Sequence, residues 1–244
     1  MKIVFLSDVH SNLEALLSVK KEIGRISPDR VFLLGDIVGY GADPSACLKI
    51  VRESTWDVIA GNHDLSVAEK LDISLLNPYA QRAVLWTKDQ LSEEEKSYLG
   101  NLPLVYKSPD FNCAHSGLVS PEKFSYLDNY PAVYRDIDFM QAKDIPLSFI
   151  AHTHIPAIFI QRGGNLYRDY SKEIEINSKY RYIINIGSVG QPRDRDSKSC
   201  FCLFDTENMV VKFIRSEYNI KPAQDKIIKA GLPFVLAVRL EGGW

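Results

Sequence analysis

The sequence predicts an α/β fold in which alternating strands and helices give way to a strand-rich second half. Through the first sixty residues, short apolar runs alternate with amphipathic helical patterns, as in a β-α-β-α-β unit of parallel strands joined by right-handed crossovers. Beyond residue 104, short apolar runs follow one another with few helical patterns between them, which favours hairpins and a meander. The chain shows no internal repeat and no long linker, so we expect residues 1–244 to form one domain.

The first sixty residues contain three short apolar runs, and each is followed by a polar turn. The runs cover residues 3–6, 31–34 and 58–60. Leucines at helical spacing follow the first run, and we expect Ser11 and Glu14 to form the capping box that opens this helix. Asp43 and Pro44 are typical of an N-cap and a first helical position, so a second helix is predicted to begin there.

The middle of the chain, residues 66–100, has a helical pattern. Ser92 and Glu95 predict another capping box, and Gly100 is expected to end that helix. An aromatic stretch further on carries one expected helix near residues 131–143.

The second half contains most of the remaining predicted strands. They cover residues 104–107, 111–115, 147–152, 157–161, 180–187, 199–205 and 210–218. Residues 222–230 predict a short helix. The final apolar run, 232–240, predicts a last strand.

Composition and charge exclude several classes of protein. The chain has 244 residues, of which 45% are hydrophobic and 25% charged, as in a globular chain rather than a disordered or fibrous one. A net charge of −2 gives no electrostatic reason to expect a nucleic acid or an anionic membrane as partner. The first apolar run is too short for a signal peptide, and no run approaches the roughly 18 residues that span a bilayer.

The four cysteines show no spacing typical of a metal or redox pair. They are Cys47, Cys113, Cys200 and Cys202. Few, scattered thiols suit a reducing compartment, so we expect packing roles for them and a cytoplasmic location for the chain.

The chain has only five histidines, and each one follows a predicted strand. They are His10, His63, His115, His152 and His154. In open α/β sheets, ligands bind just outside the carboxyl ends of the strands. One histidine in such a place would be an ordinary core or surface residue, but all five at strand ends predict a functional site.

The polar residues around these histidines suit a metal centre. Imidazole and carboxylate ligands together favour manganese, iron or zinc, and a carboxylate can bridge two metals. Two metals about 3.5–4 Å apart can clamp a phosphoryl group and generate hydroxide from water at neutral pH. The candidate ligands are enough for two metals and leave one histidine unused: they are Asp8, His10, Asp36, Asn62, His115, His152 and His154.

The order of these motifs resembles the calcineurin-like metallophosphoesterase superfamily, and in particular its small prokaryotic members. The motifs are Asp8-Val9-His10, Gly35-Asp36, Gly61-Asn62-His63-Asp64, a lone His115, His152-Thr153-His154 and the segment Gly187 to Arg193. The resemblance implies a four-layer α/β/β/α sandwich of two packed mixed β-sheets, with the site at the strand ends.

The resemblance also implies a role for each motif residue. It assigns two sets of metal ligands: Asp8, His10 and His154 for one ion, and Asn62, His115 and His152 for the other. Asp36 would bridge the two ions. His63 would contact substrate phosphate and protonate the leaving group as general acid. Asn62 and Arg193 are weaker candidates for contacts with the substrate.

The implied activity is hydrolysis of a small phosphate mono- or diester by metal-activated hydroxide, and the motifs do not choose between the two ester classes. A non-catalytic scaffold on the same fold is one alternative, and the complete set of ligands argues against it. A nuclease is another alternative. Nucleases of this superfamily are longer, and the charge balance of this chain does not indicate DNA contacts.

Four positions depart from the patterns of the superfamily. The protein phosphatases of the calcineurin kind have an aspartate where this chain has Gly39 and an arginine where it has Tyr40. They have a glutamate where this chain has Asp64, so these positions argue against a protein phosphatase. Ala151 stands where the family usually has glycine, and we expect the turn to tolerate the added methyl group. Tyr40 is expected either to stack on a substrate ring or to pack.

Further polar and aromatic residues carry weaker signals. Gln191 and Arg193 follow a predicted strand and could reach substrate oxygens, although an exposed turn is the simpler interpretation. Asn12 fits the polarity of a helix start. Three tyrosines at four-residue spacing predict part of the core or a lid rather than a ring-stacking groove: Tyr126, Tyr130 and Tyr134.

Overall fold

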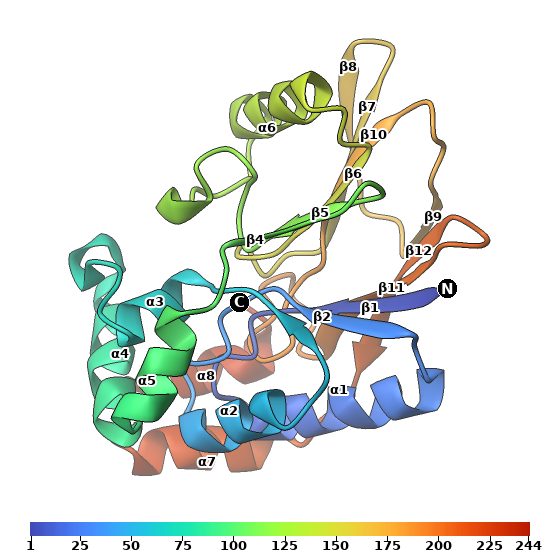
Figure 1. Ribbon diagram of the computed structural model, residues 1–244. Helices are drawn as coiled ribbons and strands as arrows, with labels where there is room; N and C mark the ends of the chain where they lie inside the picture. Colours follow the sequence, from blue (N-terminus) through green and yellow to red (C-terminus); the bar gives the residue numbers. More distant parts are fainter.

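The computed structural model describes residues 1–244 and shows two six-stranded β-sheets packed face to face (Figure 1). The first sheet has the strand order β3 (Asp57–Val58), β2 (Arg30–Leu33), β1 (Lys2–Leu6), β11 (Ser199–Asp205), β12 (Val210–Ser216) and β9 (Glu173–Glu175). The second has the order β4 (Val105–Lys107), β5 (Asn112–Ala114), β6 (Leu147–Ile150), β10 (Arg181–Asn185), β7 (Ala157–Arg162) and β8 (Asn165–Asp169). Both sheets are mixed: β1 to β3 pair in parallel in the first, and β5, β6 and β10 in the second.

Helices cover the outer faces of the sheets. The helices are α1 (Leu13–Ile26), α2 (Pro44–Arg52), α3 (Asn62–Val67), α4 (Pro78–Gln90), α5 (Glu93–Gly100), α6 (Tyr130–Ala142), α7 (Ile220–Lys229) and α8 (Phe234–Gly242). Two short 3₁₀ helices are η1 (Ile73–Leu75) and η2 (Pro121–Lys123). Figure 1 shows α1, α2 and α7 outside the first sheet and α6 outside the second. This arrangement confirms the expected four-layer sandwich.

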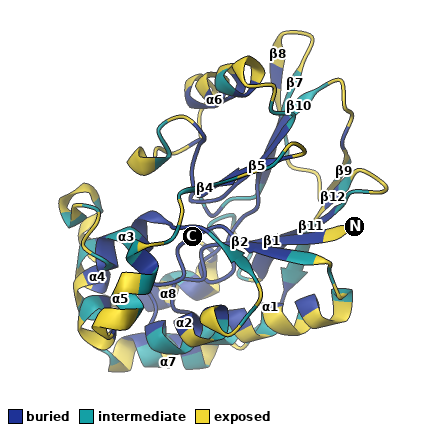
Figure 2. Ribbon diagram, viewed as in Figure 1, coloured by how far each residue is buried: buried dark blue, intermediate teal, exposed yellow.

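Strand β1 shows how the layers share the core. Ile3 and Phe5 point between the two sheets, whereas Val4 and Leu6 point toward the helices outside the first sheet. Because both faces are buried, the strand is a continuous apolar run rather than an alternating one (Figure 2). Between the sheets, the rings of Phe5 and Phe149 stack with centroids 3.8 Å apart. Fully burying each such side chain contributes about 1.5–3 kcal/mol to folding.

The end of the chain corrects one expectation: residues 234–242 form helix α8 and not a strand. Leu236 and Leu240, one helical turn apart, are buried against α7 and α4, which gives this segment one apolar face. The sequence-based interpretation was wrong because a short apolar run fits a buried helix as well as a strand. Helix α7 was predicted correctly, with a start two residues earlier than expected.

Two smaller corrections concern local structure. The N-cap of α1 is Asn12, whose side-chain oxygen accepts a hydrogen bond from Ala15 N, so the expected box of Ser11 and Glu14 is wrong. Strands β8 and β9 were not predicted, because their short sequences are polar and half exposed. The capping box of Ser92 and Glu95 is confirmed.

All four cysteines are free and buried, which confirms the expected packing role. The cytoplasmic location inferred from them stays a prediction. No helix is both long and apolar enough to cross a bilayer.

Candidate metal centre and substrate cleft

The candidate ligands meet at one edge of the two packed sheets, where strands from both sheets end. They lie in five segments: Asp8 and His10 follow β1, Asp36 follows β2, Asn62 and His63 open α3, His115 follows β5, and His152 and His154 follow β6. All of these side chains are buried, with exposed fractions of at most 6%. The folding of both sheets is therefore needed to assemble one polar cluster.

The cluster is centred on two carboxylates. His154 Nε2 lies 3.2 Å from Asp8 Oδ1, and His115 Nε2 lies 3.3 Å from Asp36 Oδ2. His10 Nε2 lies between the carboxylates, 3.7 Å from Asp8 Oδ1 and 3.6 Å from Asp36 Oδ2. These distances bring the two predicted groups of ligands together around a shared centre.

Three groups of side chains could each hold a metal ion, because their donor atoms lie within 4.8 Å of one another. The groups are Asp8 with His10 and His154, Asp36 with His115 and His152, and His10 with Asp36 and His63. The first two match the ligand sets that the motifs imply. The third was not predicted, and it brings His63 within reach of the same centre.

The backbone orients three of the histidines. The Nδ1 atoms of His10, His115 and His154 lie 3.2, 2.6 and 2.6 Å from the carbonyl oxygens of Val38, Leu34 and Gln191. A histidine that donates its Nδ1–H to a carbonyl presents the lone pair of Nε2, which is the usual arrangement of metal-binding histidines. The loops therefore fix which nitrogen faces the two carboxylates.

Backbone strain is concentrated at the cluster. Five of the seven candidate ligands have positive φ angles of 49–67°: Asp8, His10, Asp36, His152 and His154. The left-handed region costs a non-glycine residue about 1–2 kcal/mol, so the surrounding fold must stabilise these conformations. Such strain is typical of functional sites, and here it turns each side chain inward just after its strand ends.

The charges of the cluster are adapted to a cation. Burial raises the pKa values of Asp8 and Asp36, but the neighbouring histidines outweigh it and hold both below their usual range. Burial lowers the pKa of His152 to about 3 and also lowers that of His10. For His115 burial acts in the same direction, but Asp36 outweighs it and raises the pKa to about 9. Two buried carboxylates are thus surrounded by mostly neutral imidazoles.

Two buried donor atoms without hydrogen-bond partners indicate that these residues suit a metal ion. Asn62 Oδ1 and His152 Nε2 are buried and have no hydrogen-bond partner within the protein. An unpartnered buried polar atom is unfavourable by about 1–3 kcal/mol, unless a ligand satisfies it. Both atoms belong to the set of residues that the motifs assign to the second metal, and both are good donors to a divalent cation.

His63 lies beside this centre, with its ring against those of His10 and Tyr40 at centroid distances of 4.8 and 4.4 Å. Burial lowers its pKa to about 4, against the raising effect of Asp36. Gly39 explains why no carboxylate orients the ring. A Cβ atom at Gly39 would lie 2.4 Å from His63 Nδ1, and Gly39 has a φ of +93°. The departure from the protein-phosphatase pattern therefore reflects a tight contact between backbone and imidazole.

Asp64 connects two of the loops. Its Oδ1 accepts hydrogen bonds from Ile37 N and Val38 N, and its Oδ2 accepts one from Gly61 N. Its pKa is raised to about 7 by burial and by the nearby Asp36. Asp64 thus fixes the loop after β2 against the start of α3, which is a structural role that the motif alone did not reveal.

Hydrogen bonds attach the segment from residue 187 to residue 193 to the loops after β1 and β6. Gly190 N and Ser188 Oγ both donate to Asp8 O, and Arg193 N donates to His154 O. Gln191 is 1% exposed, so the interpretation as an exposed turn is wrong for it. Ala151, the other departure, is buried in the core between the sheets and its methyl group is accommodated there.

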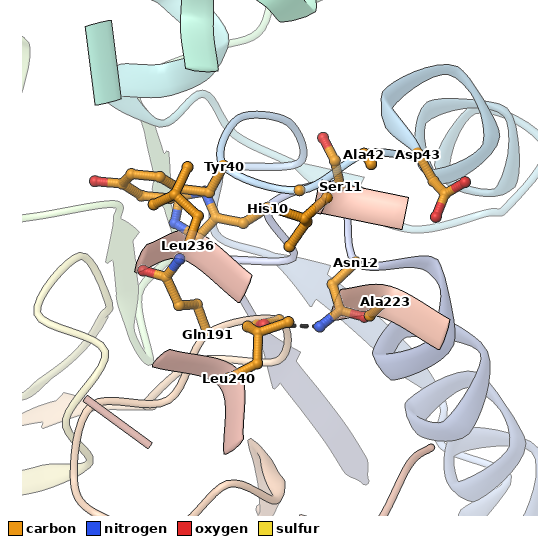
Figure 3. A pocket seen from close by; sticks show the side chains of 13 residues that line it. His10, Ser11, Asn12, Tyr40, Ala42, Asp43, Gln191, Ala223, Leu236 and Leu240 are labelled. Carbon is orange, nitrogen blue, oxygen red and sulfur yellow. Dashed lines mark hydrogen bonds between the residues drawn. The ribbon is translucent and has the colours of Figure 1, made fainter. Parts of the chain in front are cut away.

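Helices α7 and α8 lie beside this segment. A cavity of about 10 Å³ lies between them and the loop. Tyr40, Gln191, Leu236 and Leu240 are among the residues that line it (Figure 3). The dashed line in the figure marks the hydrogen bond that Asn12 Nδ2 donates to Gly190 O, 2.8 Å long. Asn12 is therefore the helix cap that its position at a helix start indicated, and it also links two loops, which the sequence did not indicate.

An open cleft of about 520 Å³ lies above the cluster. Asn62 and His63 line its base, and Arg193 and Tyr126 lie on its walls. The ring of Tyr126 stacks on His152, with centroids 4.2 Å apart, although Tyr126 stays 49% exposed. Tyr40 is buried and packs, but it also lines the cleft. Because Arg193 lines the cleft, its guanidinium occupies a position from which it could contact a substrate.

Two parts of the site were missed by the sequence analysis. The tyrosines at 126, 130 and 134 are 40–51% exposed, so the core alternative is wrong, and only Tyr126 lines the cleft. The lid alternative stays a prediction. The supporting helix α8 was also missed. The spacing of Leu236 and Leu240 fits one face of a helix and also one face of a strand, so the sequence held no signal that decides between them.

Three comparisons place the chain among known proteins. The model of the calcineurin-like phosphoesterase family matches residues 1–184. The crystal structure of a metallophosphoesterase from Sphaerobacter thermophilus is 35% identical, with a TM-score of 0.86 over the whole of both chains. An uncharacterised protein of Methanocaldococcus jannaschii is 37% identical over 98% of this chain and 96% of its own length.

A more distant match covers only part of the chain. A symmetrical bis(5′-nucleosyl)-tetraphosphatase of Actinobacillus pleuropneumoniae is 26% identical over 124 residues, which are 48% of this chain and 46% of that enzyme.

Proposed function

We propose, from the premise that this chain belongs to the calcineurin-like phosphoesterase family, that it hydrolyses small phosphate mono- or diesters with two bound metal ions. One observation carries the proposal. All seven candidate ligands converge in one buried cluster, and three of its histidines already have their Nε2 atoms turned toward the carboxylates. A scaffold without activity would not need this complete and strained arrangement.

In this proposal the ligands divide as the motifs imply. One ion is held by Asp8, His10 and His154, the other by Asn62, His115 and His152, and Asp36 bridges them. Manganese, iron and zinc all suit such a mixture of imidazole and carboxylate ligands. Bound there, the ions would lower the pKa of water and polarise the phosphoryl oxygens.

The side chains around the ions have their own parts in the reaction. His63 gives a proton from its imidazole to the leaving oxygen, as general acid. A bound phosphate would favour the protonated form of His63, because a nearby negative charge raises the pKa of an imidazole. Arg193 and Asn62 face the same cleft and orient the substrate by hydrogen bonds to its phosphoryl oxygens.

The cleft and the relatives support a small phosphorylated substrate. A volume of about 520 Å³ is that of a pocket for a small molecule. The partial similarity to a bis(5′-nucleosyl)-tetraphosphatase supports nucleotide phosphates as members of this class. Because both sheets contribute ligands, we also propose that residues 1–244 act as one domain.

The test is hydrolysis of bis(p-nitrophenyl) phosphate and of p-nitrophenyl phosphate, with added Mn²⁺ and with a chelator as control. We expect chelator-sensitive turnover of at least one ester, and the ratio of the two rates would choose between diester and monoester substrates. Bound metal should be counted by elemental analysis in the same preparation. No turnover together with no bound metal would contradict the proposal and favour the scaffold.

A further inference from the structure

Two arginines beside the cleft share a single acceptor. Arg193 Nη2 donates to Gln191 Oε1 over 2.8 Å, and Arg239 Nη1 donates to the same oxygen over 3.1 Å. Gln191 is buried, so its amide is fixed between the two guanidinium groups. The two cations come from parts of the chain more than forty residues apart, and the fold brings them together.

No aspartate or glutamate side chain balances the positive charge of this pair. Neither arginine forms an ion pair with an aspartate or glutamate side chain, and the amide oxygen that they share is neutral. Arg193 Nε is buried and has no hydrogen-bond partner. Arg239 also donates a hydrogen bond from its Nε to Trp244 O, and its guanidinium lies 5.4 Å from the centroid of the Trp244 ring. Two neighbouring like charges repel each other, and an anion between them would relieve that repulsion.

One arginine of the pair, Arg193, lines the cleft above the metal centre, and Arg239 adjoins it through Gln191. Arg193 lines the cleft together with His63 and His154, and its guanidinium lies 5.8 Å from the centroid of the Tyr40 ring. Partial burial, and then Arg193, lower the pKa of Arg239, which agrees with their proximity. Figure 3 shows how Gln191 is placed beneath Tyr40, next to Leu236 of α8.

Helix α8 fixes the position of Arg239. Leu236 and Leu240 of this helix are buried against α7 and α4, and Arg239 lies next to Leu240 on the side that reaches Gln191. The guanidinium is thus held by packing on a regular helix rather than by a loop. A preorganised cation of this kind loses less conformational entropy when it binds an anion.

We infer that Arg193 and Arg239, joined by Gln191, form a second anion site that takes a further phosphoryl group of the substrate. This inference rests on the proposed function and adds a substrate class to it: molecules with at least two phosphoryl groups, one at the metal centre and one at the arginine pair. Arg239 is a specificity residue in this arrangement, because it binds the part of the substrate that does not react. Guanidinium groups suit this task, since their planar forks match phosphoryl oxygens.

The test compares the affinities of two non-hydrolysable ligands by calorimetry on the Mn²⁺-loaded protein. The ligands are the phosphonate analogues of AMP and ADP, in which methylene groups replace every hydrolysable bridging oxygen. We expect the ADP analogue to bind at least about 10-fold more tightly than the AMP analogue, as one charged hydrogen-bonded contact allows. Arg239→Gln should reduce this ratio to below about 3-fold.

Two further variants control for charge and for folding. Arg82→Gln removes an exposed arginine of α4 that has no ion pair or side-chain hydrogen bond, and it should keep the wild-type ratio. Arg239→Lys keeps a cation on α8 and should restore part of the preference that Arg239→Gln loses. An unchanged ratio in Arg239→Gln would overturn the inference, as would an equal loss in Arg82→Gln.

The same titrations separate the possible sources of the anion. Inorganic phosphate is titrated into protein saturated with the AMP analogue. The substrate assignment would be overturned if phosphate bound in a way that depends on Arg239 while the AMP and ADP analogues bound with equal affinity. Because binding is measured without turnover, failure of the inference differs from failure of the proposed function. Turnover of simple esters with no effect of Arg239→Gln on the ratio would leave the proposed function standing alone.

Discussion

The metal centre and the walls of the cleft above it are neighbours in space, but they come from different parts of the sequence. The candidate ligands lie within a few residues of strand ends, and backbone hydrogen bonds orient them. The cleft is walled by η1, by Tyr126 before α6 and by Arg193, and α8 supports it from below. Short motifs therefore encode the chemistry of the site, whereas the packing of remote elements shapes what it accepts.

This difference also appears in burial. The ligands are buried and many of them are strained, so they tolerate little change. The wall residues keep much of their surface, and Tyr126 is about half exposed. Substitutions in the centre should abolish activity, and substitutions in the walls should alter selectivity by modest factors.

The largest effect is expected for Asp36→Asn at the metal centre. Asp36 Oδ2 lies near both His10 and His115, which belong to the two different ligand sets. Loss of the bridging carboxylate should lower the occupancy of both metals and reduce turnover by more than about 10³-fold, since metals supply several kcal/mol of charge stabilisation. Elemental analysis of the variant measures occupancy, and loss of only one metal would contradict the bridging role.

A smaller effect is expected for His63→Ala, which lies between the two regions. The proposed general acid should be lost while both metals stay bound, and turnover should fall by roughly 10²–10⁴-fold. Because His63 lies close enough to His10 and Asp36 to bind a metal with them, the number of metals bound to the variant distinguishes a ligand from a general acid. If the variant loses metal, His63 is a ligand and the assignment as a general acid fails.

The packing beneath the cleft gives the next prediction, Leu236→Ala in α8. Leu236 is fully buried, so truncation should destabilise the fold by about 2–5 kcal/mol. Because α8 lies outside the ligand loops, the metal content should be unchanged. Thermal unfolding and elemental analysis measure the two effects, and Val238→Ala, at an exposed position of the same helix, is the control. Metal loss equal to that of Asp36→Asn would mean that the two regions are not independent.

The predictability of the two regions differs for physical reasons. The candidate ligands, whose role as metal ligands stays a prediction, could be selected from the sequence because each motif is local: a strand ends, the backbone turns, and a histidine or aspartate follows. The parallel pairing of β1, β2 and β3 then brings their carboxyl ends to one edge, as alternating strands and helices require.

The surroundings of the cleft could not be predicted from the sequence, because nothing in the local sequence of residues 232–240 distinguishes a strand from a helix. Only the presence of α7 and α4 beside Leu236 and Leu240 decides the outcome. The same holds for Arg239, whose partner Gln191 is 48 residues away. The roles of Gly39 and Asp64 likewise depend on contacts across loops, with His63 for one and with the backbone of Ile37 and Val38 for the other.

The smallest effect is expected at the wall itself, for Tyr126→Ala. The exposed ring of Tyr126 stacks on His152 and faces the cleft, where it can also contact an aromatic leaving group. Aromatic pairs contribute about 0.5–1.5 kcal/mol, so KM for p-nitrophenyl phosphate should rise by roughly 2- to 12-fold. KM for glycerol phosphate, which has no ring, should change less. Tyr130→Ala removes an equally exposed ring outside the cleft and is the matched control. An equal rise in KM for both substrates would show that Tyr126 acts by supporting His152, and the wall would then belong to the metal centre rather than to substrate selection.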